Sequence, residues 1–429
     1  MLRTNRPFDG YAQRLCRLLQ APHDESRLDG VMAALDGEAS TLLRRTISLQ
    51  SRRDVGCFFT SAGLADRLVE GIDTAAWKTI ADPSCGAGDL LLSIGRRLPL
   101  QRSVRSTLQA WGQLLVGRDL NDDLVRTTRV RLALLASVRH GRRATLGERE
   151  LARLLPEIRK GDGQALDLEH PTLVLLNPPF GSTLTSSTGW GSGRLGRAAV
   201  FTAAVVERLP HQSRLLAILP DVLRSGSNDR NWRMHMSSLL HVETADAQGQ
   251  FDAWTDIDVF ILRAAVEPER SSLAEWQFDD APCGIRLGDL VEVRVGTVVP
   301  HRDRHTGSWS SYIEAHDLPL GGRFNADSTR RRRHSGRRFQ PPFVAVRRTS
   351  RPGQSQPRAL GVLIEGAAPV LVENHLMVCQ PINKQAPSCD EILDVLGNPV
   401  TSAWLDARIR CRHLTVRALR DVPMPKPYG

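Results

Sequence analysis

The chain has 429 residues and a formal net charge of +10, from 57 lysines and arginines against 47 aspartates and glutamates. That length predicts two or three domains and is ample for a buried core. The hydrophobic share of 41% and the charged share of 24% are those of a folded globular protein, which excludes a chain disordered throughout. Apolar runs such as 173–176 fall far short of the ~20 residues of a membrane span.

The seven cysteines are scattered, and no two of them form a C-x-x-C pair. This spacing indicates neither a zinc site nor a disulfide framework. The first residues lead into no apolar segment, so we expect no secretory signal. We therefore expect a cytoplasmic protein with reduced thiols, no membrane contact and no metal.

Apolar residues spaced by three and four predict a helical segment within residues 1–54. From residue 79 onward, short apolar strands alternate with amphipathic helices, which predicts an α/β fold with a mostly parallel, Rossmann-like sheet. Because no helix separates the last two strands, we expect them to form an antiparallel pair at the end of the sheet. The expected strands are 79–82, 113–118, 157–161, 172–176, 214–219, 241–247 and 256–263, and the expected helices are 61–72, 88–98, 121–138, 197–209 and 229–240.

The composition changes after Pro268, and the remaining chain is rich in glycine, proline and arginine, with short β-like runs. These runs are 291–299, 343–347, 360–365 and 370–372. We expect a boundary near 266–284. The chain then divides into an N-terminal helical segment at 1–54, a catalytic domain at 55–266 and an α+β domain at 285–429.

The positive charge is concentrated in residues 323–358, which hold eleven arginines and one aspartate, a balance of +10. Such clustering is typical of a surface that binds a polyanion, the alternative being a solvated loop. The neighbouring serine, glycine and proline residues predict a loop that orders on binding. We expect the contacts with nucleic acid to come from Arg330, Arg331, Arg332, Arg333, Arg337, Arg338, Arg347 and Arg348.

The first motif that carries chemistry follows the strand at 79–82 and reads Asp82-Pro83-Ser84-Cys85-Gly86-Ala87-Gly88. Glycines between a strand and a helix let the backbone pass close to a ligand at the carboxyl edge of the sheet. Asp82 is placed to accept hydrogen bonds from an ammonium group, and Asp119, after the next strand, from two ribose hydroxyls. Asp162 ends a third strand.

Three acids at neighbouring strand ends would repel a phosphate, and the chain has no G-K-[ST] lysine at this position. They suit a nucleoside that carries a cationic centre instead of phosphate, which describes S-adenosylmethionine. The alternative is that each aspartate only caps a turn or a helix.

The second motif, Asn177-Pro178-Pro179-Phe180, follows the apolar strand at 172–176. Proline has no backbone N–H and a fixed φ, so the Pro178 carbonyl should point outward without a local donor. That carbonyl and the Asn177 side-chain oxygen give two acceptors for an exocyclic amine, and Phe180 gives a face for a planar base. Positioning of this kind would direct the lone pair of the amine toward a donated methyl group. The alternative is a proline-rich turn that only closes the strand.

Residues 191–196 fit a G-x-G-x-x-G pattern, but we expect no strand before them. They therefore lack the context of a nucleotide-binding fingerprint. We interpret them as a mobile loop that follows the site and touches DNA.

Together the two motifs resemble those of the N6-adenine DNA methyltransferases, in which the cofactor motif precedes Asn-Pro-Pro-Phe and a target-recognition domain comes last. The resemblance covers about residues 55–265 and implies a Rossmann-like methyltransferase sheet that binds S-adenosylmethionine. Gly56 to Thr60 resemble the opening motif of the family, with Ser61 in place of the usual proline, so Thr60 would contact the methionine end of the cofactor.

The resemblance also assigns the other cofactor contacts. Asp82 would face the methionine amino group, Leu120 would cover the adenine, and Asp162 would accept from the adenine amine. Asp119 falls at the position of the ribose-binding acid. The remaining cofactor-binding positions are Ser84, Cys85, Gly86, Gly88 and Asn177.

The C-terminal part resembles the target-recognition units of type I restriction specificity subunits, on the stretches 287–296, 311–318 and 414–425. The resemblance implies site-specific methylation of an extruded adenine in double-stranded DNA, within a restriction–modification or related defence system. Any nuclease or other defence partner would be a separate protein. Two alternatives stay open: methylation of another amine (cytosine N4, an RNA base or a protein glutamine), and a catalytically silent subunit that reads DNA.

Overall fold

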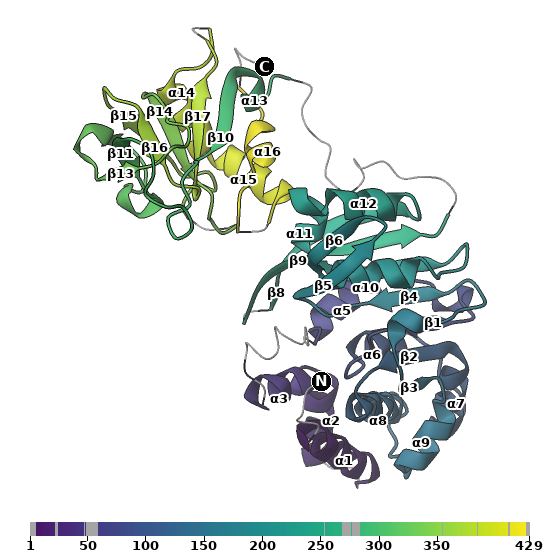
Figure 1. The fold of residues 1–429 in the computed structure, drawn as a ribbon. Helices are drawn as coiled ribbons and strands as arrows, with labels where there is room; N and C mark the ends of the chain where they lie inside the picture. Colours follow the sequence, from purple (N-terminus) through teal and green to yellow (C-terminus); the bar gives the residue numbers. More distant parts are fainter. Residues whose placement is uncertain are drawn as a thin grey trace. The chain divides into compact units, whose positions relative to one another are not determined.

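The computed structural model describes residues 6–21, 25–46, 48, 59–252, 254–267, 276, 284–353, 355–383, 385–410 and 412–425. The chain forms two compact units, one of residues 1–223 and 230–276 and the other of residues 224–229 and 277–429 (Figure 1). Gly56, Cys57 and Phe58 of the expected cofactor motif lie outside the described residues.

A seven-stranded sheet in the order β3-β2-β1-β4-β7-β9-β8 forms the centre of the first unit. Five strands are parallel, whereas β9 runs antiparallel to both of its neighbours, β7 and β8. The prediction of a mostly parallel sheet with an antiparallel pair at its end is confirmed. The strands are β1 (Ile80–Asp82), β2 (Leu115–Asp119), β3 (Ile158–Lys160), β4 (Leu173–Leu176), β7 (Arg214–Pro220), β8 (His241–Asp252) and β9 (Thr255–Ala265).

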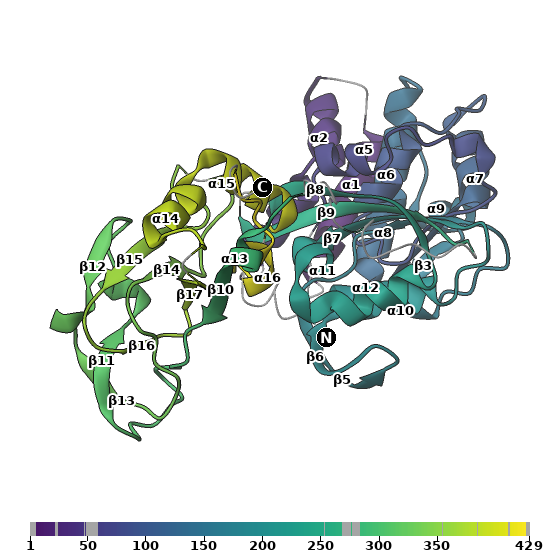
Figure 2. The same cartoon turned by 90° about the horizontal axis from the view of Figure 1, so that it is seen from above.

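Helices lie on both sides of this sheet, with α5 and α6 on one side and α10 and α12 on the other (Figure 2). Burial on both sides explains why β4 and β7 are continuous apolar runs rather than alternating patterns. No helix among the described residues is long and apolar enough to cross a membrane. The helices are α5 (Ala62–Leu68), α6 (Asp89–Gly95), α7 (Val104–Leu114), α8 (Asp122–Arg139), α9 (Glu148–Leu154), α10 (Arg197–Val206), α11 (Asp221–Ser225) and α12 (Arg230–Ser237).

The expected N-terminal helices are α1 (Arg6–Gln20), α2 (Glu25–Leu35) and α3 (Glu38–Thr46). Arg126 of α8 binds Asp9 of α1 at 2.7 Å and Glu148 of α9 at 2.8 Å, which ties these helices together.

The prediction of a loop at residues 191–196 is wrong. They form strand β6 (Gly191–Gly196), which pairs antiparallel with β5 (Ser182–Thr188), because the small residues of both segments allow a tight hairpin.

The second unit contains a five-stranded sheet in the order β10-β17-β14-β15-β12 and a three-stranded sheet in the order β13-β11-β16. Its described residues are rich in β-structure and also form helices. Its strands are β10 (Val291–Val295), β11 (Trp309–Ile313), β12 (Arg323–Asn325), β13 (Arg331–Arg333), β14 (Phe343–Arg347), β15 (Gly361–Glu365), β16 (Val370–Val372) and β17 (Leu376–Pro381). Its helices are α13 (Leu287–Leu290), α14 (Cys389–Gly397), α15 (Pro399–Arg408) and α16 (Val416–Arg420).

The arginine-rich segment 323–358 is therefore not the loop that the sequence predicts, because it contains β12, β13 and β14. Backbone pairing in two sheets orders it without a ligand. Apolar residues such as Phe343 and Val346 bury it on one face, and the arginines point outward or bind backbone carbonyls.

Candidate active site

Asp82, Asp119 and Asn177 lie at the carboxyl ends of β1, β2 and β4, or directly after them. These strands are neighbours in the sheet, in the order β2-β1-β4, and they run parallel. The three side chains therefore share one edge of the sheet, which is where ligands bind in open α/β folds.

The turn between β1 and α6 requires glycine at two positions. Gly86 has φ +50° and Gly88 has φ +89°, in the left-handed region where a side chain is strained. A Cβ at Gly88 would lie only 2.7 Å from Thr128 Cγ2, and a Cβ at Gly86 would lie 3.2 Å from Phe59 Cε1. The Gly88 amide donates to the Cys85 carbonyl at 2.7 Å, which closes the turn.

The turn rests on α8, a contribution that the sequence reasoning missed. Thr128 Oγ1 donates to the Gly86 carbonyl at 2.9 Å, and Arg131 Nη1 donates to the Ala87 carbonyl at 2.6 Å and to Asp89 Oδ1 at 2.8 Å. Arg131 is fully buried. The sequence offered one signal for this contact: Thr128 and Arg131 are polar residues three apart on an otherwise apolar face of the expected helix 121–138.

A second missed residue is Gly163, which follows Asp162 at the end of β3. A Cβ at Gly163 would overlap the Pro83 carbonyl oxygen, at 1.7 Å. The absence of a side chain therefore lets the chain after β3 pack directly against the loop between β1 and α6.

Asp119 is built into the same turn. One carboxylate oxygen accepts from the Gly86 amide at 3.1 Å and the other from the Asn121 amide at 2.8 Å. Burial raises the pKa of the Asp119 carboxyl to about 6, although the two amides act in the opposite direction. Each oxygen keeps acceptor capacity, which is what a ligand with two adjacent hydroxyls would use.

Asp82 is a buried acid, with 1% of its surface exposed. Its Oδ1 accepts from the Ser84 amide at 3.0 Å, and no described residue forms an ion pair with it. Burial, together with the negative charges of Asp119 and Asp89, raises the pKa of the Asp82 carboxyl to about 8, although the Ser84 amide acts in the opposite direction. A buried carboxyl without a counter-charge is stabilised by a cation, so this position suits an ammonium group of a ligand.

Asn177 connects this loop to the second motif. Its Nδ2 donates to Thr60 Oγ1 at 2.8 Å, and its backbone carbonyl accepts from Ser84 Oγ at 3.1 Å. Its Oδ1 is buried and has no hydrogen-bond partner among the described residues. Buried polar atoms are almost always satisfied, so an orphaned oxygen here indicates an acceptor kept for a ligand.

Phe180 does not present an open face in this structure. Its ring is 1% exposed and packs edge-to-face on Phe251 of β8, with centroids 5.3 Å apart and an angle of 78°. The predicted stacking role requires the ring to leave Phe251. The two prolines between Asn177 and Phe180 are buried (Pro178) and half-buried (Pro179).

Leu120 and Asp162 lie at the ends of β2 and β3, and both are exposed. Leu120 is 72% exposed, which leaves a large apolar side chain uncovered beside Asp119. Asp162 Oδ1 accepts from the Gln164 amide at 3.0 Å, so it does cap a turn, with its other oxygen available. Thr60 and Cys85 are buried and Ser84 is half-buried at the same edge.

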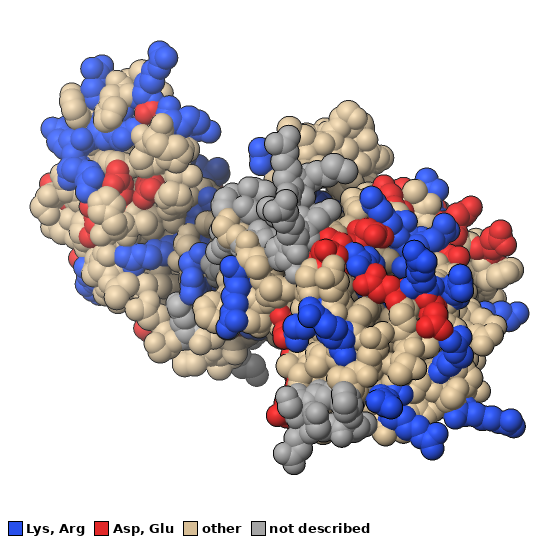
Figure 3. All heavy atoms as spheres, turned by 90° about the horizontal axis from the view of Figure 1, so that it is seen from below, with Lys and Arg blue, Asp and Glu red and all other residues tan. Residues whose placement is uncertain are grey.

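The structure separates the eight predicted DNA-binding arginines into two groups. Basic side chains gather on the second unit, at the left of Figure 3, with few acids among them. Arg330, Arg331, Arg333 and Arg337 are exposed, whereas Arg332 is only 6% exposed and lies over the Tyr312 ring at 5.4 Å. Arg338, Arg347 and Arg348 are half-buried and donate to backbone carbonyls of the same unit.

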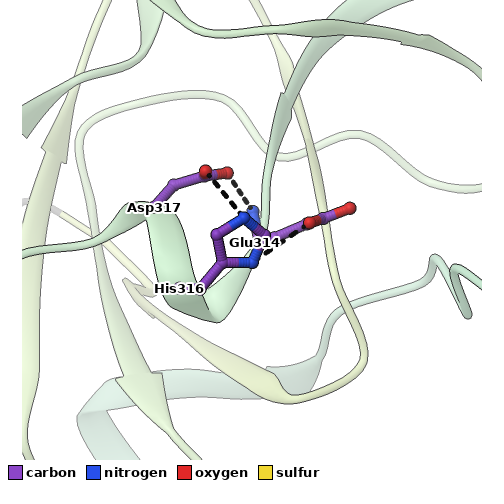
Figure 4. Close-up of side chains that lie close together, drawn as sticks. All are labelled: Glu314, His316 and Asp317. Atoms are coloured by element: carbon purple, nitrogen blue, oxygen red, sulfur yellow. Dashed lines mark hydrogen bonds and ion pairs between the residues drawn. The ribbon is translucent and has the colours of Figure 1, made fainter.

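Arg330 is exposed but already has acidic partners. Figure 4 shows Glu314, His316 and Asp317 side by side after the end of β11. One side-chain nitrogen or oxygen from each of them, of the kind that could ligate a metal, lies within 4.8 Å of the other two. The Arg330 guanidinium donates to Glu314 at 3.1 Å and to Asp317 at 2.6 Å. The Arg330 guanidinium therefore already neutralises the negative charge that could otherwise attract a cation to this cluster. Arg331 and Arg333, on one face of β13, are the arginines of this strand better placed for a polyanion.

No protein-family model and no curated protein matches the chain. Among solved structures, the type IIG restriction endonuclease BpuSI is similar, with 12% identity and a TM-score of 0.42, over 91% of this chain and 60% of that one. A putative class I S-adenosylmethionine-dependent methyltransferase from Listeria monocytogenes has 15% identity and a TM-score of 0.35, over 63% and 91%. A modification subunit of a putative type I restriction enzyme from Vibrio vulnificus YJ016 has 15% identity and a TM-score of 0.36, over 66% and 54%.

The similarity to restriction–modification methyltransferase subunits and to S-adenosylmethionine-dependent methyltransferases is therefore distant. The chain spans 60% of the length of the first of these structures and 54% of the third. The similar structures also include restriction–modification enzymes bound to DNA.

Proposed function

We propose that the chain is a site-specific DNA methyltransferase that transfers a methyl group from S-adenosylmethionine to N6 of an extruded adenine in double-stranded DNA. One observation carries the proposal. A buried, uncompensated carboxyl at Asp82 and an orphaned oxygen at Asn177 lie at adjacent strand ends, joined by the hydrogen bond from Ser84 to the Asn177 carbonyl. The acid suits the ammonium group of S-adenosylmethionine, and the neighbouring oxygen suits the amine that receives the methyl group.

The residues at the edge of the sheet fit this cofactor. Asp82 would hold the methionine ammonium and Asp119 the ribose hydroxyls, while Leu120 and Asp162 would cover and bind the adenine. Gly86 and Gly88 allow close approach, with Ser84 and Cys85 between β1 and these glycines. Thr60 would contact the methionine end. The cofactor supplies an electrophilic methyl group on sulfur.

The second motif would hold the acceptor. Asn177 Oδ1 and the Pro178 carbonyl would each accept one hydrogen of the amine, which favours a tetrahedral nitrogen with its lone pair directed at the methyl group. The Asn177 oxygen is closed to solvent here, so a neighbouring side chain must move before an amine reaches it. Extrusion of the base is required because a paired adenine cannot reach such a site.

The domain assignment belongs to the same proposal: a helical segment at 1–54, a catalytic domain at 55–266 and a target-recognition domain at 285–429. The exposed arginines of the last part, Arg331 and Arg333 above all, would bind phosphates or guanine edges. A nuclease or other defence protein would act as a separate partner.

The test is expression in a host that lacks DNA methylation, followed by sequencing that detects N6-methyladenine. We expect one short modified sequence with the wild type and none with Asn177→Ala. Gln113→Ala, an exposed residue on α7 near the opposite edge of the sheet, is the matched control and should methylate normally. In vitro, Asn177→Ala should bind the cofactor within about threefold of the wild type but lose roughly 100-fold or more in turnover. Modified cytosine, or unmodified DNA with the wild type, refutes the assignment.

A further inference from the structure

The hairpin of β5 (Ser182–Thr188) and β6 (Gly191–Gly196) begins directly after Gly181, which follows Phe180 of the candidate catalytic motif. It projects from the body of the first unit (Figure 2). Its strands pair from Ser182 opposite Gly196 to Thr188 opposite Gly191, so the turn is tight. The candidate site therefore continues into a protruding two-stranded element.

The hairpin exposes an unusual pair of side chains. Leu184 is 78% exposed, more than the other large apolar side chains that are exposed in the described part of the chain. Arg194 lies opposite it in the register and is also exposed. An apolar side chain and a guanidinium thus stand side by side on one face. Trp190, in the turn itself, is half-buried and packs against the main core, which anchors the hairpin.

Hydrogen bonds at both ends fix the hairpin in place. At its base, the Arg197 amide donates to the Gly181 carbonyl at 2.9 Å, and Arg194 Nη1 donates to Ser182 Oγ at 3.2 Å. At its turn, the Gly191 amide donates to Thr188 Oγ1 at 2.9 Å. The exposure of Leu184 is therefore a property of an ordered element, and a partner would meet a preformed surface.

The charge of this region fits a polyanion. No aspartate or glutamate occurs between Glu169 and Glu207, whereas Arg194 and Arg197 both lie there. The other hairpin residues are mostly serine, threonine and glycine, which are small enough for a close approach to a nucleic-acid groove. A hairpin of this kind would not be repelled by phosphates.

We propose that the β5–β6 hairpin enters duplex DNA at the target site and that Leu184 fills the gap in the base stack left by the extruded nucleotide, while Arg194 binds a neighbouring phosphate. The inference rests on the proposed function, because that function requires an extruded base. Apolar wedges such as leucine insert between base pairs in proteins that deform DNA. The hairpin starts one residue after the motif that would hold the extruded base, so wedge and site would act on neighbouring nucleotides.

The first experiment needs neither a known recognition sequence nor methylation. Fluorescence anisotropy of the full chain would compare an intact duplex with one that has a single abasic site, a ready-made gap. We expect the wild type to bind the abasic duplex roughly 5- to 20-fold more tightly, and Leu184→Ala to show less than a twofold preference. Val400→Ala, 74% exposed in the second unit, is the matched control and should keep the preference. A wild type without the preference, or a Leu184→Ala variant that keeps it, overturns the proposal.

The second experiment separates the wedge from the chemistry. On a normally paired target, Leu184→Ala should transfer methyl groups roughly 10- to 100-fold more slowly than the wild type, because the variant no longer offsets the free energy lost when a base is unstacked. On a target whose adenine faces an abasic site and is already loosened, the variant should recover to within about threefold, which a merely misfolded protein would not do. If the wild type prefers the gap but modifies no adenine, the proposed function fails and the wedge stands. If methylation is normal and Leu184→Ala slows both targets equally, the wedge fails alone.

Discussion

Replacement of Asp82 by asparagine should stabilise the protein, and the gain should grow with pH. Burial and neighbouring acids raise the pKa of the Asp82 carboxyl from 3.8 to about 8. The folded protein therefore binds this proton more tightly than the unfolded chain does. The stability that the protonated carboxyl provides is complete below about pH 4 and is lost as pH rises toward 8.

The size of the effect follows from the shift. Each pH unit between the two pKa values changes the free energy of unfolding by about 1.4 kcal/mol, and asparagine, which does not titrate, avoids that loss. Asparagine also keeps an oxygen for the Ser84 amide. The difference in free energy of unfolding, Asp82→Asn minus wild type, should rise by roughly 3 kcal/mol between pH 5 and pH 7.5 and level off above about pH 8.

Urea unfolding followed by pulse proteolysis would measure this difference. Asp119→Asn is the graded control. The pKa of the Asp119 carboxyl is raised only to about 6, so its gain should be complete near pH 6. The same difference at pH 5 and pH 7.5 for Asp82→Asn, or a difference that shrinks with pH, would refute the reasoning.

Three further predictions concern the loop between β1 and α6 and the arginines of β13. At pH 7, the binding of S-adenosylmethionine should release close to one proton, because Asp82 must ionise to face an ammonium; calorimetry in two buffers of different ionisation heat measures this, and equal heats would contradict it. Gly88→Ala should lower the free energy of unfolding by roughly 1–3 kcal/mol and weaken cofactor binding, since φ is +89° and Thr128 is in the way. In the control Gly141→Ala, with φ +60° and open space around it, only the backbone strain remains, and cofactor binding should be normal. Arg331→Ala with Arg333→Ala should lower the slope of log affinity against log salt for DNA by about two, and an unchanged slope would exclude phosphate contacts there.

All seven strands of the main sheet were expected from the sequence. Strands β4 and β7 are the clearest, because a parallel strand buried on both faces is a continuous apolar run. Helix α7 was missed, although its buried residues Val104, Leu108 and Trp111 have helical spacing and Ser103 caps it with Ser106. The hairpin β5–β6 was missed because its serine, threonine and glycine residues are also typical of loops.

The candidate site is less accessible to sequence reasoning, because its details depend on distant contacts. The chain positions of Asp82, Asp119 and Asn177 place them at one sheet edge, but nothing local shows that Phe251 covers the Phe180 ring. Likewise, the number of arginines in 323–358 gives the net charge of the segment but does not show which of them are exposed and which bind the protein's own backbone. Arg332 is buried over the Tyr312 ring, which the pairing of β11 with β13 brings beside it, and its guanidinium donates to the distant Asp303 carbonyl.

The most direct test of the account is a structure of the protein with an unreactive analogue of S-adenosylmethionine and a target duplex. We expect the extruded adenine to place its amine about 3 Å from Asn177 Oδ1 and from the Pro178 carbonyl, with Asp82 facing the ammonium of the analogue. An adenine bound elsewhere, or an Asn177 oxygen that remains buried and without a partner in the complex, would contradict the account.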